Sequence, residues 1–403
     1  MEGLPVRSFL DRGSGFSEHR YLLFAICYLS FTHLMEWLIV FGSVAWIGLL
    51  LLPWRPWGAR ERLEVTGLAS ETDFAKIAVL IPARNEEENV QRTLRALRDQ
   101  GQDLKIFLID DQSIDHTKEK AQAVGLKNLI IVDGRELPDG WTGKLWALEQ
   151  GRKLVTSGLL LLLDADIELA PGIVPALHQK LVSENLDLVS IMATLRTDHF
   201  WERWLVPAFV FFFKLVYPFA RGNNPKSRLG VAAGGCILLR TEMLATIGGF
   251  EAVRGAVIDD CTLAQKVKEA GGKTWIGLSR GVKSHRPYPD LSSFWAMVSR
   301  TAYTQLRYSV LRLLAVTCLM LIVFWGPFLA IMTTSCMLKV VALVGWSCMI
   351  AAYLPTVRFY RLSPLWTATL PIIATLYLLM TWSSAIEYWK GRRSIWKGRV
   401  YRR

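Results

Sequence analysis

Apolar residues are gathered in blocks along the chain, and the first block is long enough to cross a membrane. The stretch from Trp37 to Pro53 is apolar or small throughout, with Glu36 before it and Trp54 after it. Its length is about the minimum that spans a hydrocarbon core roughly 30 Å thick. No small-residue cleavage site follows, as one would after a signal peptide. We therefore predict an uncleaved membrane anchor over residues 35–54.

A shorter apolar patch, Tyr21 to Phe31, lies directly before this anchor. The patch is too short to span a membrane by itself, and Met35 would make a natural start between the patch and the anchor. We interpret residues 1–34 as an N-terminal extension that is either an upstream-start artefact or dispensable.

Three further apolar segments of near-spanning length close the chain: Leu313 to Met332, Val340 to Pro355 and Leu365 to Ile386. They predict C-terminal transmembrane segments within residues 311–388. The run from Phe209 to Phe219 is shorter and is interrupted by Lys214, a pattern typical of an interfacial or re-entrant segment.

Between these blocks, short buried strands alternate with amphipathic helices. The predicted strands are Lys76–Ile81, Leu104–Ile109, Leu129–Val132 and Leu159–Leu163, and the predicted helices are Glu86–Gln100, Ile114–Val124 and Gly143–Val155. This alternation predicts an α/β domain over residues 74–290, with a parallel sheet covered by helices on both faces. In such sheets ligands bind at the carboxyl ends of the strands.

Three acidic pairs stand out because each comes where a strand has just ended. They are Asp110 with Asp111, Asp164 with Asp166, and Asp259 with Asp260. An unpaired buried carboxylate is costly, so acids at these positions are expected to face the ligand crevice of the sheet.

The spacing of Asp164 and Asp166 places both carboxylates on the same side of an extended strand end. Two converging carboxylates repel each other unless a cation lies between them, and Mg²⁺ or Mn²⁺ shared with a substrate's phosphates meets that need. The alternative is a solvated turn, in which Asp is common. The all-leucine strand before the pair and the sequence Ile167 to Pro171 after it favour the metal site.

Several ordered motifs resemble a family 2 glycosyltransferase of the GT-A (Rossmann-like, nucleotide-diphospho-sugar transferase) fold. They are IPARNEEENV (81–90), IDDQSID (109–115), LLLDADIELAP (161–171), IGGF (247–250) and IDDCTLAQKVKEAGG (258–272). A second set is more closely similar to the hopene-associated glycosyltransferases of bacterial hopanoid clusters: GWTGKLWA (140–147), AAGGCILLR (232–240), RTAYTQLRYS (300–309) and WKGR (396–399). The resemblance covers roughly residues 35–403.

The resemblance implies a nucleotide-binding role for Pro82, Arg84 and Glu86. The family often has Tyr where this chain has Arg84, so a base or ribose contact is less firmly implied there. The resemblance also implies that Asp110 and Asp111 hold uracil and ribose, which suits carboxylates as acceptors of N–H and O–H bonds.

Two of these positions have simpler structural alternatives. Asp110 and Asp111 would serve equally as the N-cap of a helix from Ile114 onward. Lys144 lies early in a predicted helix, where a cation and free N–H groups meet phosphate, but it would also suit an ordinary surface position.

The resemblance aligns Asp260 with the catalytic base of the family's Glu-Asp motif, with Asp259 in place of the Glu. A base is needed because the acceptor hydroxyl loses its proton as it attacks the anomeric carbon. The alternative for Asp260 is an N-cap for a helix over Thr262–Ala270, and both roles are compatible.

Arg300 stands where processive relatives carry Gln-x-x-Arg-Trp, but the Gln and Trp are missing. Only a phosphate contact from Arg300 is therefore implied, and polymer synthesis is not. The apolar residues around Arg300 predict an interfacial amphipathic helix over residues 291–310, on whose solvated face Arg300 would otherwise lie.

Composition and charge agree with a membrane protein that carries a soluble domain. Hydrophobic residues make up 52% of the chain and mean hydropathy is +0.27, which excludes a disordered or collagen-like chain. The six Cys form no CxxC pair, as expected for thiols in a reducing compartment. The six His show no zinc spacing. The net charge is +12, but no recognition motif for nucleic acid accompanies it, so no nucleic-acid partner is expected.

Basic residues crowd the tail over residues 389–403, next to Trp389 and Trp396, and indicate a membrane-interface anchor. Nucleotide sugars are cytoplasmic, so the α/β domain should be too. One anchor before the domain and three spans after it would put this tail outside, against the positive-inside rule. Either one C-terminal segment is re-entrant, Val340–Pro355 as the shortest, or the charge rule fails here. We expect the tail inside.

Together these features predict a multi-pass enzyme of the bacterial inner membrane with a cytoplasmic catalytic domain. The resemblance implies a metal-dependent hexosyltransferase that transfers one sugar, with inversion, from a UDP-sugar to a lipid hydroxyl, and family association points to a hopanoid. The alternatives are transfer to ceramide, diacylglycerol or polyprenyl phosphate, or a non-catalytic membrane scaffold that retains the fold.

Overall fold

The computed structural model describes residues 14–65, 72–101, 103–396 and 399–402. Within these residues the main sheet has eight strands in the order β3-β2-β1-β4-β7-β6-β8-β5. The strands are β1 (Ile77–Ala83), β2 (Lys105–Asp110), β3 (Leu129–Asp133), β4 (Leu159–Leu163), β5 (Ile167–Leu169), β6 (Leu188–Thr194), β7 (Cys236–Arg240) and β8 (Thr274–Ser284).

The expected parallel arrangement holds for only part of this sheet. Strands β3, β2, β1 and β4 run parallel, and β6 runs parallel to β8. Strand β7 is antiparallel to both of its neighbours, and β5 is antiparallel to β8. The four strands predicted from the sequence, β1–β4, are therefore parallel as expected, but the expectation of a parallel sheet does not extend to β5 and β7.

Helices cover both faces of the sheet, as predicted. One face packs against α2 (Val90–Arg98), α3 (Thr117–Gln122) and α5 (Ile173–Ser183), and the other against α4 (Gly143–Arg152), α8 (Thr241–Thr246) and α9 (Asp259–Glu269). Leu161 of β4 packs with the first group, while Leu160 and Leu162 pack with the second. Burial on both faces explains the all-leucine strand.

Helices α2 and α3 begin three or more residues later than the sequence pattern predicts. The backbone N–H groups of Glu86 and Glu87 are bonded to the side chains of Thr117 and Asp115, at 2.8 and 3.2 Å. These side-chain bonds tie the β1–α2 loop to the β2–α3 loop, and the helices start only beyond them.

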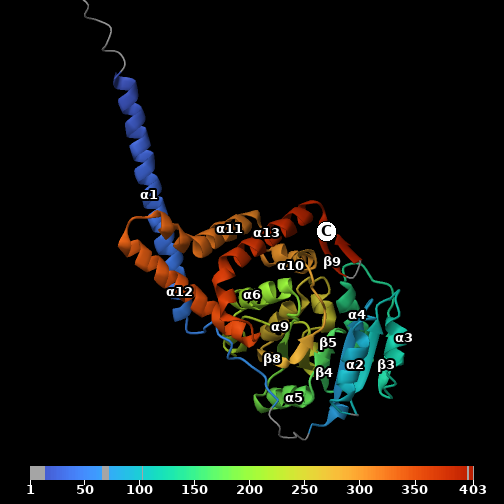
Figure 1. Ribbon diagram of the computed structural model, residues 1–403. Helices are drawn as coiled ribbons and strands as arrows, with labels where there is room; N and C mark the ends of the chain where they lie inside the picture. Colours follow the sequence, from blue (N-terminus) through green and yellow to red (C-terminus); the bar gives the residue numbers. More distant parts are fainter. Residues whose placement is uncertain (1–13, 66–71, 102, 397–398, 403) are drawn as a thin grey trace, which may run out of the picture.

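Among the described residues, four helical segments are long and apolar enough to cross a membrane: His33–Leu51, Val310–Met332, Cys336–Phe359 and Pro364–Trp389. They belong to α1 (Ser14–Leu51), α11 (Val310–Trp325) with the 3₁₀ turn η3 (Gly326–Met332), α12 (Cys336–Phe359), and η4 (Pro364–Thr369) with α13 (Leu370–Trp389). Figure 1 shows these helices gathered on one side of the sheet domain, with α1 extending beyond the others.

We expected the segment Val340–Pro355 to be re-entrant because it is the shortest of the three C-terminal segments, but it is part of a longer helix. It lies inside the continuous 24-residue helix α12. Helix α12 packs closely along α1, since a Cβ added to Gly345 would lie 2.6 Å from the Cα of Ser43. The residues on either side of Val340–Pro355 are helical as well, so α12 is as long as the other candidate spans.

Helices α6 (Phe200–Val216) and α10 (Leu291–Gln305) lie between the sheet and the candidate membrane spans (Figure 1). Most of the run Phe209–Phe219 belongs to α6, where Phe211 is buried and its ring contacts that of Tyr353 on α12. The run is therefore mostly helical and partly buried, and its position relative to a membrane interface stays a prediction. The short helix α7 (Phe219–Asn223) and the 3₁₀ turns η1 (Phe74–Lys76) and η2 (Gly249–Val253) complete the domain.

The two ends of the chain are only partly described. Helix α1 begins at Ser14, so residues 14–34 of the expected extension continue into the anchor as one helix. Residues 1–13 lie outside the described residues. In the basic tail, β9 (Arg392–Trp396) and β10 (Arg399–Arg402) pair as an antiparallel hairpin.

Candidate functional site

A pocket of about 280 Å³ lies at the carboxyl ends of β1, β4, β6 and β8, where the sheet topology places a ligand. Its ionisable lining consists of five acids and three cations: Glu86, Asp164, Asp166, Asp259, Asp260, Lys144, Arg286 and Arg300. Two of the three predicted acidic pairs thus meet in one pocket, although they are separated in sequence by almost a hundred residues.

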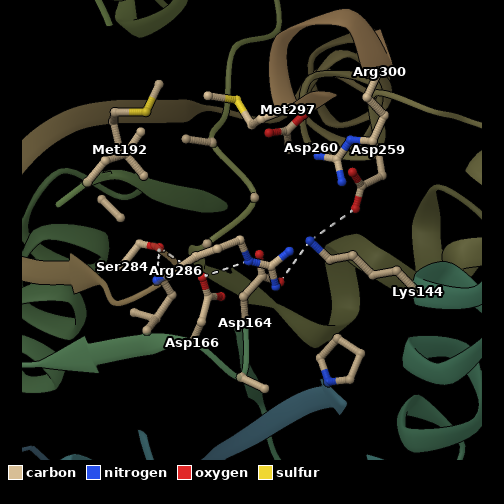
Figure 2. Close-up of a pocket in the computed structure, with 18 of the residues that line it drawn as sticks. Lys144, Asp164, Asp166, Met192, Asp259, Asp260, Ser284, Arg286, Met297 and Arg300 are labelled. Carbon is tan, nitrogen blue, oxygen red and sulfur yellow. Dashed lines mark hydrogen bonds and ion pairs between the residues drawn. The ribbon is translucent and has the colours of Figure 1, made fainter. Parts of the chain in front are cut away.

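Lys144 joins the two acidic pairs electrostatically. It is the second residue of α4, and its Nζ lies 2.8 Å from Asp164 Oδ1 and 3.4 Å from Asp259 Oδ2 (Figure 2). Burial alone would lower the pKa of Lys144, but the two carboxylates more than offset this and raise it above its ordinary value. Lys144 is therefore a permanently charged residue of the pocket.

Asp166 is held by a second cation that the sequence did not reveal. The Nε of Arg286 lies 3.4 Å from Asp166 Oδ2, and its Nη2 lies 2.8 Å from Glu86 Oε1. The hydroxyl of Ser284, the last residue of β8, donates to Asp166 Oδ2 at 2.8 Å. Burial would lower the pKa of Arg286, but Asp166 and Glu86 raise it, so Arg286 also stays charged.

Asp164 and Asp166 do not lie on an extended strand end, as their spacing had suggested. Strand β4 ends at Leu163, and the backbone N–H of Ile167 donates to the carbonyl of Asp164 at 3.1 Å, which closes a turn. The two carboxylates still line the same pocket, but each faces a different cation (Figure 2). Burial raises the pKa of Asp164, Lys144 opposes this, and Asp166 raises it further.

Asp260 is in the first turn of α9, whose N-cap is Ile258, so neither Asp259 nor Asp260 is the N-cap. Its Oδ1 accepts a bond from the backbone N–H of Cys261 at 2.7 Å. Burial, followed by the neighbouring Asp259 carboxylate, raises the pKa of Asp260 to about 7. A carboxyl group with such a pKa can take up and release a proton near neutral pH.

Gly234 lets the backbone before β7 approach these charged groups. A Cβ at this position would lie 3.1 Å from Lys144 Nζ and 3.4 Å from Asp260 Oδ2. Glycine therefore leaves the floor of the pocket open beside both side chains.

The opposite wall of the pocket is apolar and comes from α6 and α10, which pack against the candidate membrane spans. Phe209 and Phe213 project from α6 and Met297 from α10. Arg300, one turn after Met297, also lines the pocket, and among the described residues it forms no ion pair. The helix predicted over residues 291–310 is observed only as far as Gln305, as α10, and Arg300 on it is both exposed and part of the pocket lining.

Arg84, Asp110 and Asp111 do not line this pocket, although Pro82 and Glu86 do. They lie together beside it, at the ends of β1 and β2, where Arg84 donates to the backbone carbonyls of Asp111 and Gln112. The N-cap alternative for the Asp pair is wrong, because α3 starts at Thr117 and Asp110 instead accepts a turn bond from Ser113.

Arg286 and Ser284 could have been found by the rule that identified the acids. Both come at or just after the end of the apolar strand β8. We applied the strand-end rule to acidic residues alone. For Asp259 and Asp260 it is wrong, because they begin α9 after the 3₁₀ turn η2 and a loop rather than after a strand.

Asp164 and Asp166 could hold a divalent ion only if a bound ligand supplied the other groups of its coordination shell. Among the described residues, no group of three or more His, Cys, Asp or Glu side chains could hold a metal ion. Mg²⁺ and Mn²⁺ are commonly held by one or two carboxylates with phosphate and water oxygens. Asp164 and Asp166 form such a partial set.

Comparisons with known proteins give matches to part of the chain. Residues 78–248, under half of the chain, match the family described as Glycosyl transferase family 2. Over 93 residues the chain is 36% identical to a 4,4'-diaponeurosporenoate glycosyltransferase of Staphylococcus haemolyticus, covering 23% of this chain and 24% of that protein. Over 132 residues it is 31% identical to an undecaprenyl-phosphate 4-deoxy-4-formamido-L-arabinose transferase of Pseudomonas paraeruginosa, covering 32% and 38%.

The fold extends further than the sequence similarity. The mannosyltransferase PcManGT of Pyrobaculum calidifontis superposes with a TM-score of 0.54 at 16% identity, over 87% of this chain and 99% of that one. The architecture is therefore a GT-A fold with long apolar helices at both ends. The chain spans well under half the length of the two curated relatives.

We predict that Arg286→Met strongly destabilises the protein, because it leaves Glu86 and Asp166 buried without their cation. Breaking a buried pair in this way costs about 3–5 kcal/mol. Arg254→Met is the matched control, since Arg254 and Glu251 form an exposed pair whose loss costs under about 1 kcal/mol. The measurement is the thermal unfolding midpoint in detergent, and equal shifts for the two variants would contradict the prediction.

Proposed function

We propose that this protein is a membrane-bound, inverting glycosyltransferase that moves one sugar from a UDP-sugar to the hydroxyl group of a membrane lipid. One observation carries the proposal: Asp164, Asp166 and Asp260 line a single pocket whose other wall is apolar and belongs to α6 and α10. These helices pack against α12 and α13, so the apolar wall adjoins the candidate membrane spans.

In this proposal the donor binds at the strand ends and across the neighbouring loops. The nucleotide would contact the following residues: Pro82, Arg84, Glu86, Asp110 and Asp111. Lys144 and Arg300 would contact the diphosphate as fixed positive charges. Mg²⁺ or Mn²⁺, held by Asp164 and Asp166, would supply further charge to the leaving diphosphate.

Asp260 is the proposed catalytic base. It accepts the proton of the acceptor hydroxyl, whose oxygen forms the new bond to the anomeric carbon. The bond from that carbon to the diphosphate breaks, and the nucleoside diphosphate leaves with the electron pair. Because this is one displacement with one base, the anomeric configuration inverts.

A catalytic base favours a hydroxyl acceptor over a phosphate. A hydroxyl group must lose its proton as it reacts, whereas a phosphate monoester is already largely ionised at neutral pH, with a second pKa of about 6. A relative named for an undecaprenyl-phosphate acceptor makes polyprenyl phosphate the alternative to test. Among neutral lipids a hopanoid comes first, because of the motif resemblance, ahead of ceramide and diacylglycerol.

The packing of α13 supports a cytoplasmic domain with the basic tail on the same side. The hydroxyl of Tyr377 donates to the carbonyl of Leu205 at 2.9 Å, and the N–H of Tyr303 donates to Ser384 Oγ at 3.1 Å. Helix α13 thus packs on α6 and α10 along most of its length. In our proposal α11 with η3 and α12 cross the bacterial inner membrane as a pair, and α13 stays at the domain.

The proposal is tested by incubating purified protein with Mn²⁺, a panel of UDP- and GDP-sugars, and hopanoid, ceramide, diacylglycerol or polyprenyl phosphate. Products are read by mass spectrometry. We expect a glycosylated neutral lipid, and Asp260→Asn should lower turnover by roughly 10²–10⁴-fold while nucleotide binding is kept. Asp133→Asn, at an exposed residue paired with Lys118, is the control.

If sugar is transferred to polyprenyl phosphate alone, the acceptor is a lipid phosphate and not a lipid hydroxyl. If no donor gives transfer, the non-catalytic scaffold is favoured. A wild-type rate for Asp260→Asn would remove the base assignment.

A second prediction concerns the metal. Asp166→Asn should weaken Mn²⁺ binding in the presence of UDP by at least about tenfold, because one of the two protein carboxylates is lost. Electron paramagnetic resonance of free Mn²⁺ measures the affinity, with Asp133→Asn again as the control. Unchanged affinity would show that the ion is held elsewhere.

A third prediction concerns pH. Asp260 is protonated below about pH 7 and cannot accept a proton there, so kcat/KM should rise with pH to a plateau, with its midpoint near 7. Asp259→Asn removes a charge that raises the pKa of Asp260, so the midpoint should move to lower pH. A midpoint that stays in place in this variant would mean that another group controls the profile.

A further inference from the structure

Four arginines surround Phe359, the last residue of α12, and we name them the Phe359 arginine cluster: Arg62, Arg280, Arg358 and Arg361. The guanidinium carbons of Arg62 and Arg280 lie 5.5 and 5.3 Å from the centroid of the Phe359 ring. Arg280 also donates from Nε and Nη2 to the carbonyl of Phe359, at 3.0 and 2.9 Å. All four side chains are exposed.

The cluster has an excess of positive charge that the neighbouring Glu64 offsets only in part. Within the described part of the chain, none of its four members forms an ion pair. On the sheet domain, by contrast, Arg152 pairs with Glu149 at 2.7 Å and Arg254 with Glu251 at 2.5 Å. Burial, followed by the neighbouring Arg361 and Arg62, lowers the pKa of Arg280, and Glu64 opposes this shift.

The cluster lies where two apolar helices reach the sheet domain. Helix α12 ends at Phe359 and α1 ends at Leu51, and both are candidate membrane spans. Leu51 and Leu365 near these ends are 76% and 83% exposed, as expected for side chains that face lipid. Residues directly beyond the end of a span lie at the depth of the lipid headgroups.

Part of the cluster has a structural role, and part has none. Arg62 and Arg280 stabilise the carboxyl end of α12 by their position at its partial negative charge and, for Arg280, by hydrogen bonds. The side chains of Arg358 and Arg361 make no hydrogen bond within the described residues. Their charges are therefore left to interact with something outside the chain.

We propose that the Phe359 arginine cluster binds the phosphate groups of anionic lipid headgroups and so holds the domain against an anionic leaflet. Guanidinium groups pair with phosphate oxygens in a bidentate manner, and basic residues at this depth gain from an anionic surface. The inference requires that α12 lies in a membrane, but it does not require that the protein transfers sugar.

The test compares lipid retention by native mass spectrometry of the full chain in detergent. The probes are phosphatidylglycerol, phosphatidylcholine and inorganic phosphate. The variant is Arg358→Gln with Arg361→Gln, and the control is Arg95→Gln with Arg98→Gln, which removes the same charge from α2. We expect phosphatidylglycerol binding to weaken by roughly fivefold for each cluster arginine removed, with the control unchanged.

Three outcomes would overturn the proposal. They are equal phosphatidylglycerol binding by variant and wild type, equal retention of phosphatidylcholine and phosphatidylglycerol by the wild type, and displacement of the lipid by millimolar inorganic phosphate. Gel filtration confirms folding, and Arg361→Gln alone gives a milder variant if the double variant fails to fold. Because the readout is binding, failure of sugar transfer would leave the result interpretable.

Discussion

Mutual repulsion among buried carboxylates is the constraint on which the pocket depends. Five acids line one cavity at the strand ends, and the protein opposes their repulsion with Lys144 and Arg286, each placed between two of them. The pKa of Asp260 nevertheless stays raised to about 7, first by burial and then by the Asp259 carboxylate. A site with this residual negative charge suits a divalent cation together with a group that loses a proton during the reaction.

The same arrangement separates the pocket into a charged side and an apolar side. The charged groups lie at the ends of strands and in the first turns of α4 and α9. Ligands bind at the carboxyl ends of strands, and the backbone N–H groups at the start of a helix bind anions. The apolar side comes from α6 and α10, whose outer faces pack against α12 and α13. A water-soluble donor and a lipid acceptor would therefore approach the reacting atoms from opposite directions, and the Phe359 arginine cluster would hold the domain at the membrane surface.

Much of the fold could be read from residue patterns. The leucine strand β4 and the apolar face of α2 were predicted because burial of a whole strand or of one helix face leaves a regular signal. The direction of β7 left no such signal, since an apolar strand reads the same in either direction. The starts of α2 and α3 were missed because Thr117 and Asp115, distant in sequence, occupy the N–H groups of Glu86 and Glu87. The length of α12 was underestimated because the helix continues through Lys339 and Arg358, charged residues that interrupt the apolar run.

The sequence alone determined which groups are chemically available, because Asp164, Asp166, Asp260 and Lys144 each follow a recognisable strand or begin a recognisable helix. Only the tertiary structure decided how they pair. Lys144 faces Asp164 and Asp259, Arg286 bridges Asp166 to Glu86, and Arg84 with Asp110 and Asp111 lies beside the pocket rather than in it. Pairing depends on distances between segments far apart along the chain, and these distances are set by the order and direction of the strands, which no local pattern encodes.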